Sequence, residues 1–372
     1  MRATFFSVCV VSLCAASLML CAGGCSRFIV AASAAPMSDA EATRQIRDLL
    51  AQSVLAKYHA GERPAKRDAH AKAQGCVKAR FTVHDGLAAG LRTGIFSHPR
   101  TYTAWIRFSN AVGGDDHAAL AHGMAIKLTG VPGLKILPAE RNATTQDFLL
   151  VNFPVFNVHT DAEYVAFLRE SQKGMPEAFF RRHPESARIT AAIAALRVSN
   201  PLEQRYFSMT PYALGSQVVK YSATPIACTT GTPLHDPGKP IPSDPNYLRG
   251  AMSDWLRTKP SCFTFTVQPR TDAAAMPTDN STVLWNEQRA PFLPVASVII
   301  PAQRFESSEE QSFCENLSFT PWHTLPAHRP LGNINAIRRV VYETISALRH
   351  RLNGVPRKEP TGAEQFPRSP TW

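Results

Sequence analysis

The chain has 372 residues, of which 44% are hydrophobic and 19% charged, a composition typical of a globular protein rather than a disordered one. Its formal net charge is +11, but the lysines and arginines are spread along the sequence without a polybasic run, so we expect no nucleic-acid partner. The sequence contains no G-x-G-x-x-G, Walker, H-E-x-x-H or G-x-S-x-G motif, which argues against a nucleotide-binding fold, a zincin and an α/β-hydrolase.

Residues 1–34 are predicted to be a secretory signal peptide. One arginine precedes a long apolar run that ends in small residues. Cleavage after Ala34 is the favoured interpretation, lipoprotein processing at Cys25 is a weaker alternative, and an uncleaved anchor is a third. We therefore expect a secreted or periplasmic protein, with membrane association only through a lipid or an uncleaved signal. No later apolar stretch is long enough to span a bilayer.

Residues 38–60 are predicted to form an amphipathic helix within an N-terminal arm, 35–61. Ser38 and Glu41 have the spacing of a capping box, and apolar residues follow at helical period. Short runs with β-like alternation come next. These predicted strands are 76–83, 103–109, 123–129, 147–156, 216–222, 262–268 and 296–300.

Further helices are predicted at 161–173, 185–197 and 245–257, and a last helix at 335–352 with Asn335 as its cap. Strands come mostly first and helices later, which favours an α+β protein built on an antiparallel sheet or barrel. The sequence shows no internal repeat. A Pro-rich segment, 356–372, is predicted to be a flexible tail.

Four cysteines follow the predicted signal peptide, and an oxidising compartment would allow three pairings among them. Cys228 and Cys262 bracket one loop region and are the best candidate pair, which leaves Cys76 and Cys314. Four unpaired, buried thiols are the alternative. No C-x-x-C occurs, so a thiolate zinc site is not expected.

The last predicted helix carries a tyrosine between two arginines. Arg338 and Arg349 lie four residues before and seven residues after Tyr342, so all three share a helix face. A positive field favours the phenolate, and a phenolate suits ferric haem, for which tyrosine is the proximal ligand in catalase. A surface helix with an incidental tyrosine is the alternative explanation of this segment alone.

Four other segments, in the same order along the chain, accompany this helix. They read RDAHAKAQGC from residue 67, WIRFSNAVGG from residue 105, AHGMAIKLTG from residue 121 and DFLLVNFPVFNV from residue 147. With RRVVYETISALR they resemble the haem-catalase superfamily in its small, catalase-related form. The resemblance covers about residues 62–354. It implies an antiparallel β-barrel core with peripheral helices, a catalase-like haem domain over 62–355, and haem b as the cofactor.

The resemblance also implies roles for individual residues. On the catalytic side, His70 would be the distal acid–base group, Asn152 an amide donor to the peroxide and Ser109 the partner of His70. Tyr342 would ligate the iron. The predicted cofactor-binding residues are Arg338 beside the phenolate, Arg67, Arg107 and Arg349 at the haem propionates, and Phe167 against the haem face.

A haem peroxidase that reduces hydrogen peroxide or organic hydroperoxides through a ferryl intermediate is the function that the resemblance favours. Its partners would be a small-molecule peroxide and an unidentified reductant, and a homo-oligomer is possible. A fatty-acid hydroperoxide isomerase or lyase on the same fold, and a haem-binding protein with low turnover, are the alternatives. This sequence departs from the family at Asp68 and Ala69, which replace an apolar pair, and at His122, which replaces an arginine.

Overall fold

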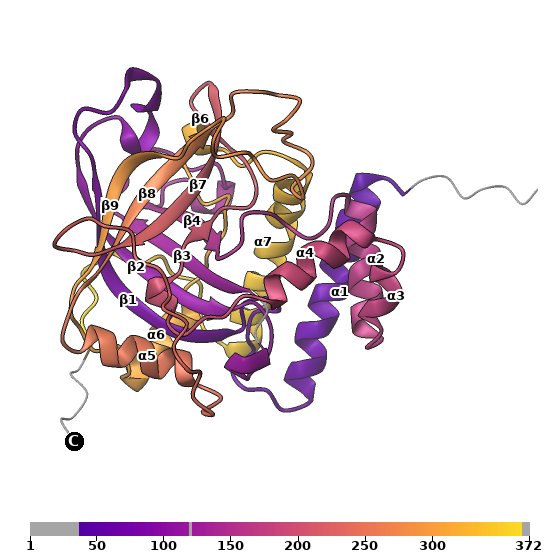
Figure 1. Ribbon diagram of the computed structural model, residues 1–372. Helices are drawn as coiled ribbons and strands as arrows, with labels where there is room; N and C mark the ends of the chain where they lie inside the picture. Colours follow the sequence, from indigo (N-terminus) through magenta and orange to yellow (C-terminus); the bar gives the residue numbers. More distant parts are fainter. Residues whose placement is uncertain (1–36, 119–120, 367–372) are drawn as a thin grey trace, which may run out of the picture. The chain divides into compact units, whose positions relative to one another are not determined.

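Nine strands, every pair antiparallel, form one sheet in the part of the chain that the computed structural model describes, residues 37–118 and 121–366 (Figure 1). The predicted signal peptide lies outside these residues. Seven strands correspond to the predicted runs, whereas β5 and β6 were not predicted. The strands are β1 (Lys72–Val83), β2 (Thr101–Asn110), β3 (His122–Thr129), β4 (Thr145–Val151), β5 (Tyr206–Phe207), β6 (Tyr212–Leu214), β7 (Gln217–Ile226), β8 (Ser261–Pro269) and β9 (Leu293–Ile300).

The sheet closes on itself into a barrel. Neighbouring strands follow the order β5-β4-β3-β2-β1-β9-β8-β7-β6, and β5 also pairs with β7, which closes a ring of eight strands. β5 contributes only two residues, with Phe207 opposite Val151 of β4 and Tyr206 opposite Ala223 of β7. The ring is closed only narrowly at this point, and farther along β4 the Asp147 amide donates to the His323 carbonyl at 2.9 Å instead of to a strand.

Side-chain alternation divides the barrel into an inner and an outer face. Inside, the Phe265 ring lies 5.1 Å from the Phe81 ring and 5.0 Å from the Phe148 ring, centroid to centroid, and all three side chains are buried. These aromatic and aliphatic side chains fill the interior as one apolar core. The barrel interior therefore holds no cofactor-sized space, and polar residues on alternate positions of β2, β3 and β4 face outward.

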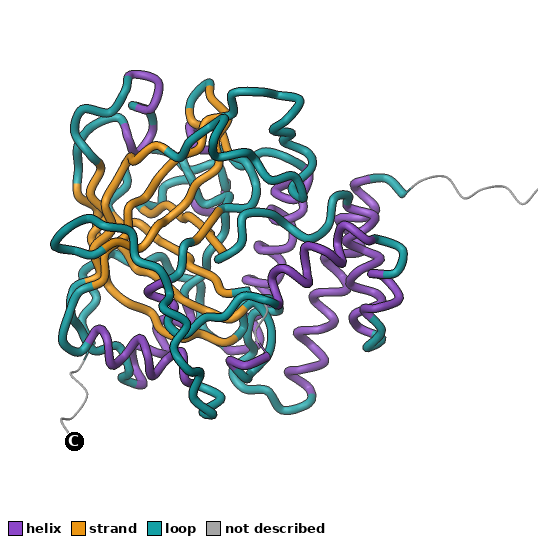
Figure 2. Tube along the Cα trace, viewed as in Figure 1, coloured by secondary structure: helices purple, strands orange, loops and turns teal. Residues whose placement is uncertain are grey.

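Seven helices lie outside the barrel in the described residues, as Figure 2 shows, so the α+β prediction with a barrel core is confirmed. Helix α7 runs along the barrel, and α1 and α2 pack against α7 in a second apolar core that includes Ile46, Val165 and Ile337. None of the described helices is long and apolar enough to cross a bilayer. The helices are α1 (Asp39–His59), α2 (Asp161–Gln172), α3 (Pro176–Phe180), α4 (Pro184–Ala194), α5 (Tyr247–Leu256), α6 (Ser308–Asn316) and α7 (Asn333–Asn353).

The structure confirms one of the two predicted helix caps, Ser38, and contradicts the other, Asn335. Ser38 caps α1, and its hydroxyl accepts a hydrogen bond from the Glu41 amide at 3.3 Å. The predicted Asn335 cap of α7 is wrong, because the helix begins two residues earlier after Gly332. The Asn335 side chain is fully buried and donates instead to the Pro211 and Leu331 carbonyl oxygens.

Two disulfides stabilise the fold. Cys228 and Cys262 are bonded, which confirms the preferred pairing, and Cys76 is bonded to Cys314. The second bond ties the C-terminal end of α6 to β1, across 238 residues of sequence. Disulfides of this kind belong to proteins that fold in an oxidising compartment.

Residues 356–366, the described part of the predicted tail 356–372, lie on the outer face of the barrel. The Glu359 carboxylate pairs with the Lys127 ammonium at 2.8 Å, and Trp105 donates from Nε1 to Glu364 at 3.1 Å. The Phe366 ring packs against Trp105 with centroids 5.8 Å apart. The segment has no helix or strand, so its order comes from these long-range partners, which local sequence patterns do not reveal.

Candidate functional site

A cavity of about 210 Å³ lies between the outer face of β2–β4 and helix α7. The strands present alternate residues to it, and α7 presents residues three, four and seven apart. Seven of the predicted site residues line this cavity: Arg67, His70, Arg107, Ser109, Arg338, Tyr342 and Arg349. Residues that are up to 282 positions apart in the sequence, Arg67 and Arg349, therefore meet at one site.

His70 faces the cavity from the barrel side. It precedes β1 with φ at +58°, in the left-handed region that few non-glycine residues adopt. Its backbone amide donates to the Ala111 carbonyl at 2.9 Å, and its Nδ1 lies 3.1 Å from the Ser109 hydroxyl. These two contacts hold the imidazole in one orientation. Because the Ser109 hydroxyl can either donate or accept, it partners Nδ1 in either neutral tautomer and leaves the other ring nitrogen unengaged by this contact.

Gly123 makes room for this pair. A Cβ atom at this position of β3 would lie 2.6 Å from His70 Nδ1 and 3.0 Å from Ser109 Oγ, both closer than van der Waals contact allows. The absence of a side chain is therefore a condition for the His70 orientation. The motif comparison gave this glycine no role, although Gly123 lies within the matched segment AHGMAIKLTG.

The surroundings keep His70 neutral. Burial, followed by the positive charges of Arg107 and Arg338, lowers the pKa of His70 to about 3. At any pH above that value the imidazole is uncharged and can accept a proton at one nitrogen. A nearby anion bound among the arginines would reduce their field and make this imidazole a stronger base.

Tyr342 faces the cavity from α7 together with Arg338. The Arg338 Nη2 donates to the Tyr342 hydroxyl oxygen at 3.3 Å, one helical turn away. The Arg338 Nη1 donates to the Asn335 side-chain oxygen at 3.1 Å and to the Thr210 hydroxyl at 3.3 Å. The guanidinium is therefore fixed with one end on the phenol. Thr210 and Asn335 are supporting residues to which the motif comparison gave no such role.

Three arginines at the cavity surround one carboxylate. Glu315, the penultimate residue of α6, lies 2.7 Å from Arg67, 3.3 Å from Arg349 and 3.9 Å from Arg107, between charged N and O atoms. Three positive guanidiniums against one negative carboxylate leave a net charge of +2. Burial, and then the charge of Arg67, lowers the pKa of both Arg107 and Arg349 to about 9. Glu315 thus neutralises the cluster only in part.

The cluster fits a ligand with two carboxylates. The side chains of Arg107 and Arg349 are each 2% exposed, and the Nε of each has no hydrogen-bond partner among the described residues. Two vacant donors and two uncompensated positive charges match the two propionates of haem in number and charge. With the Tyr342 phenol on the same cavity, the residues present fit haem b, the predicted cofactor.

The structure does not bring Asn152 to the cavity. Its side-chain oxygen accepts from the His122 backbone amide at 2.8 Å, and its backbone amide donates to the His122 carbonyl at 2.9 Å. Val151, the residue before it, lines the cavity, since successive residues of a strand point to opposite faces. None of the described side chains that line the cavity is an amide.

Phe167 also lies away from the cavity. It packs within the helical layer, where its ring centroid is 5.4 Å from that of Phe179 and 6.0 Å from that of Phe180. Besides Tyr342, three other aromatic residues line the cavity: Phe156, Tyr164 and Phe319. Burial raises the pKa of Tyr164, so its phenol stays neutral. The aromatic wall of the cavity therefore does not include Phe167.

Two of the three residues at which the motifs depart from the haem-catalase pattern are at the cavity wall, whereas His122 does not line it. Asp68 and Ala69, immediately before His70, both line it. The Asp68 carboxylate lies 3.7 Å from the Lys57 ammonium. Asp68 therefore places an acidic group at this wall of the cavity.

A second group of potential metal ligands has a different explanation. Oxygen or nitrogen atoms of Glu140, His323 and Glu359 lie within 4.8 Å of one another. Lys127 pairs with Glu359 at 2.8 Å, and Arg357 pairs with Glu140. Side-chain cations already compensate these carboxylates, so the group is an ion-pair network that attaches residues 356–366 to the barrel.

Comparisons with known proteins agree with this architecture. No protein-family model and no curated protein sequence matches the chain. A bacterial catalase aligns with 85% of this chain and 65% of its own, at 16% identity and a TM-score of 0.60. A fungal catalase aligns with 80% and 62%, at 18% identity and 0.60. Catalase A from Saccharomyces cerevisiae aligns with 84% and 67%, also at 18% identity and 0.60.

The chain thus spans about two thirds of the length of these catalases. At such low identity the likeness concerns the fold alone, and the predicted recognition is confirmed at that level. The closed eight-stranded antiparallel barrel, with its surrounding helices, is a catalase-like fold.

Proposed function

We propose that this protein binds haem b and reduces hydrogen peroxide or organic hydroperoxides. The observation that supports it is one cavity with three matched parts: the Tyr342–Arg338 pair on α7, the His70–Ser109 pair on the barrel side, and an arginine cluster of net charge +2. No single part is specific to haem. Their combination in a catalase-like fold is what favours this function over a generic anion site.

In this proposal α7 provides the iron ligand and its electrostatic support. Tyr342 would ligate iron through its phenolate oxygen, and the Arg338 charge would favour the ionised form of the phenol. Arg107 and Arg349 would donate their vacant Nε groups to the propionates, with Arg67 beside them. Haem supplies the redox-active iron at which the peroxide O–O bond is cleaved.

His70 would move the proton during that cleavage. A hydroperoxide must lose a proton from one oxygen and gain one on the other, and a neutral imidazole can do both in turn. The depressed pKa of His70 ensures that the imidazole is neutral when the peroxide arrives. Ser109 holds Nδ1 and prevents ring rotation between the two steps. The disulfides and the predicted signal peptide favour action outside the cytoplasm.

A second function, haem binding with little turnover, is favoured by Val151. An amide donor at this position would stabilise charge on the peroxide, and valine cannot do so. Rapid disproportionation of hydrogen peroxide is therefore not the expected activity. Peroxide-driven oxidation of an aromatic donor would support the peroxidase, and its absence in a haem-loaded protein would favour the low-turnover function. Rearrangement of a lipid hydroperoxide without a donor would support the isomerase or lyase alternative.

The absorption spectrum of the protein reconstituted with haem tests the proposal directly. We expect one equivalent of haem and the spectrum of a tyrosinate-ligated ferric haem. Tyr342→Phe removes the phenol oxygen and keeps the ring, so it should lose that spectrum while the apoprotein keeps its fold by circular dichroism. Tyr58→Phe, a change in a tyrosine outside the cavity, serves as the control. Failure of the wild-type protein to bind haem would rule the proposal out.

A further inference from the structure

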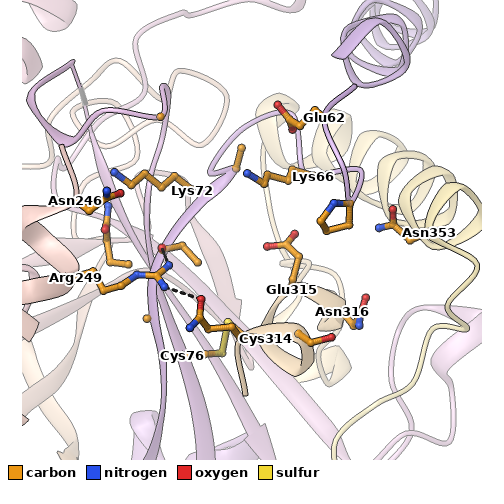
Figure 3. Close-up of a pocket in the computed structure, with 18 of the residues that line it drawn as sticks. Glu62, Lys66, Lys72, Cys76, Asn246, Arg249, Cys314, Glu315, Asn316 and Asn353 are labelled. Carbon is orange, nitrogen blue, oxygen red and sulfur yellow. Dashed lines mark hydrogen bonds between the residues drawn. A yellow bond between two sulfur atoms is a disulfide. The ribbon is translucent and has the colours of Figure 1, made fainter. Parts of the chain in front are cut away.

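Glu315 occupies an unusual position between two cavities. Its carboxylate pairs with the arginines of the candidate site, and the residue also lines a larger cavity of about 860 Å³. Figure 3 shows the Glu315 side chain at this second cavity, near Lys66 and the Cys76–Cys314 disulfide. The carboxylate is 16% exposed, so it has one side on the cluster and one side toward solvent.

The surroundings fix where the carboxylate lies. Cys314, the preceding residue, is bonded to Cys76 of β1, which anchors the end of α6 beside the cluster. Arg349 donates to the Glu315 backbone oxygen at 2.9 Å, and Arg67 and Arg349 both donate to the Leu317 carbonyl. The arginines are thus oriented by backbone acceptors as well as by the carboxylate, so their positions do not depend on the Glu315 charge alone.

We propose that Glu315 is a resident counter-ion that stabilises the haem-free protein and weakens its affinity for haem. The inference rests on the proposed function, since it assigns the arginine cluster to the propionates. Without a ligand, three buried or half-buried guanidiniums repel one another, and Glu315 is the carboxylate that offsets them in the described structure. With haem bound, the two propionates and Glu315 compete for the same guanidiniums.

The charge of the arginine cluster determines how Glu315 affects apoprotein stability and haem affinity. The haem-free cluster carries +2 with Glu315 and +3 without it, so removal of the carboxylate destabilises the apoprotein. The carboxylate repels any anion that binds beside it, so its removal strengthens haem binding. A residue that only orients the arginines would behave differently, because its loss would weaken haem binding and apoprotein stability together.

The test compares Glu315→Gln with wild-type protein and with Glu310→Gln. Glutamine keeps the shape of the side chain and removes its charge. Glu310 lies on the same helix, is also buried, and has no ion-pair partner among the described residues. Burial raises the pKa of Glu310 to about 7, so its neutral form is already accessible. Thermal unfolding of the apoprotein gives its Tm, and titration with haem gives the haem Kd.

We expect Glu315→Gln to lower the apoprotein Tm by about 4 °C and to tighten the haem Kd about tenfold. Glu310→Gln should change neither. If the variant apoprotein does not fold, it is produced with haem, and haem transfer to excess apomyoglobin should then be about tenfold slower than from the wild type. An unchanged or weaker affinity in Glu315→Gln overturns this inference alone, whereas a wild-type protein that binds no haem overturns the proposed function with it.

Discussion

Gly123→Ala gives a sharp test of how His70 is positioned. A methyl group there would lie 2.6 Å from His70 Nδ1, 2.7 Å from Cε1 and 3.0 Å from Ser109 Oγ. Ordinary contact needs about 3.4 Å, so the ring must move by roughly 0.8 Å, and the 3.1 Å contact with Ser109 would be lost. Overpacking of this kind costs about 1–3 kcal/mol.

Two measurements follow from that displacement. For a chain of this length each kcal/mol corresponds to about 1–2 °C in Tm, so we expect Gly123→Ala to melt about 3 °C lower. A misplacement of about 1 Å costs an acid–base group about 100-fold in rate. Stopped-flow reaction of the haem-loaded variant with peroxide should therefore slow by about that factor, toward the rate of His70→Ala. Haem affinity should stay close to that of the wild type, because Gly123 lies on the barrel side of the cavity.

Gly250→Ala is the matched control, since a Cβ atom at Gly250 in α5 meets nothing within 4 Å. It should leave both Tm and the peroxide reaction unchanged or slightly raise the Tm through better helix propensity. A Gly123→Ala protein that reacts with peroxide at the wild-type rate would refute the assignment of His70 as the proton-transfer group held by Gly123 and Ser109.

Two further predictions concern the attachments of the chain outside the cavity. Burial by itself would raise the pKa of Glu359, but the nearby Lys127 and His323 outweigh burial and lower this pKa to about 2. The ionised carboxylate therefore stabilises the folded state fully above pH ~4.3, its pKa in the unfolded chain. This stabilisation decreases as the pH falls toward 2. Glu359→Gln should thus lower the Tm by about 3 °C at pH 7, and scanning calorimetry should show the difference shrinking below pH ~4.3 and vanishing below pH ~2; a difference that persists there contradicts the ion-pair account. Serine at both Cys76 and Cys314 opens a loop of 238 residues and should cost about 5 kcal/mol, against about 4 kcal/mol for the same change at Cys228 and Cys262, whose separation is 34. Haem transfer to apomyoglobin should slow only in the first variant, since Cys314 anchors the Glu315 carboxylate that competes with the propionates; an equal change in both variants would show that the disulfide acts through global stability.

The sequence determined the parts of the fold that depend on local periodicity. Alternation identified all six strands of eight or more residues and most of the seven-residue β4, where the predicted run continued past Val151. Ser38 and Glu41 marked the start of α1, and the cysteine spacing singled out the Cys228–Cys262 pair. The Arg338–Tyr342–Arg349 spacing placed three side chains on one face of α7, and all three line the cavity. These features follow from rules that act within a helix, a strand or a loop.

Only the tertiary structure decided the rest, because it depends on contacts between distant segments. Two residues of β5 close the barrel, and a run so short carries no periodic signal. Strand register, set by pairing with β3, points Val151 rather than Asn152 at the cavity. The Cys76–Cys314 disulfide holds the end of α6 beside the arginines and so brings Glu315 to them. Glu359 attaches the C-terminal segment to the buried Lys127. A charge that is balanced by a residue more than 200 positions away has no local signature, so the sequence could name the arginines and the tyrosine but not the carboxylate among them.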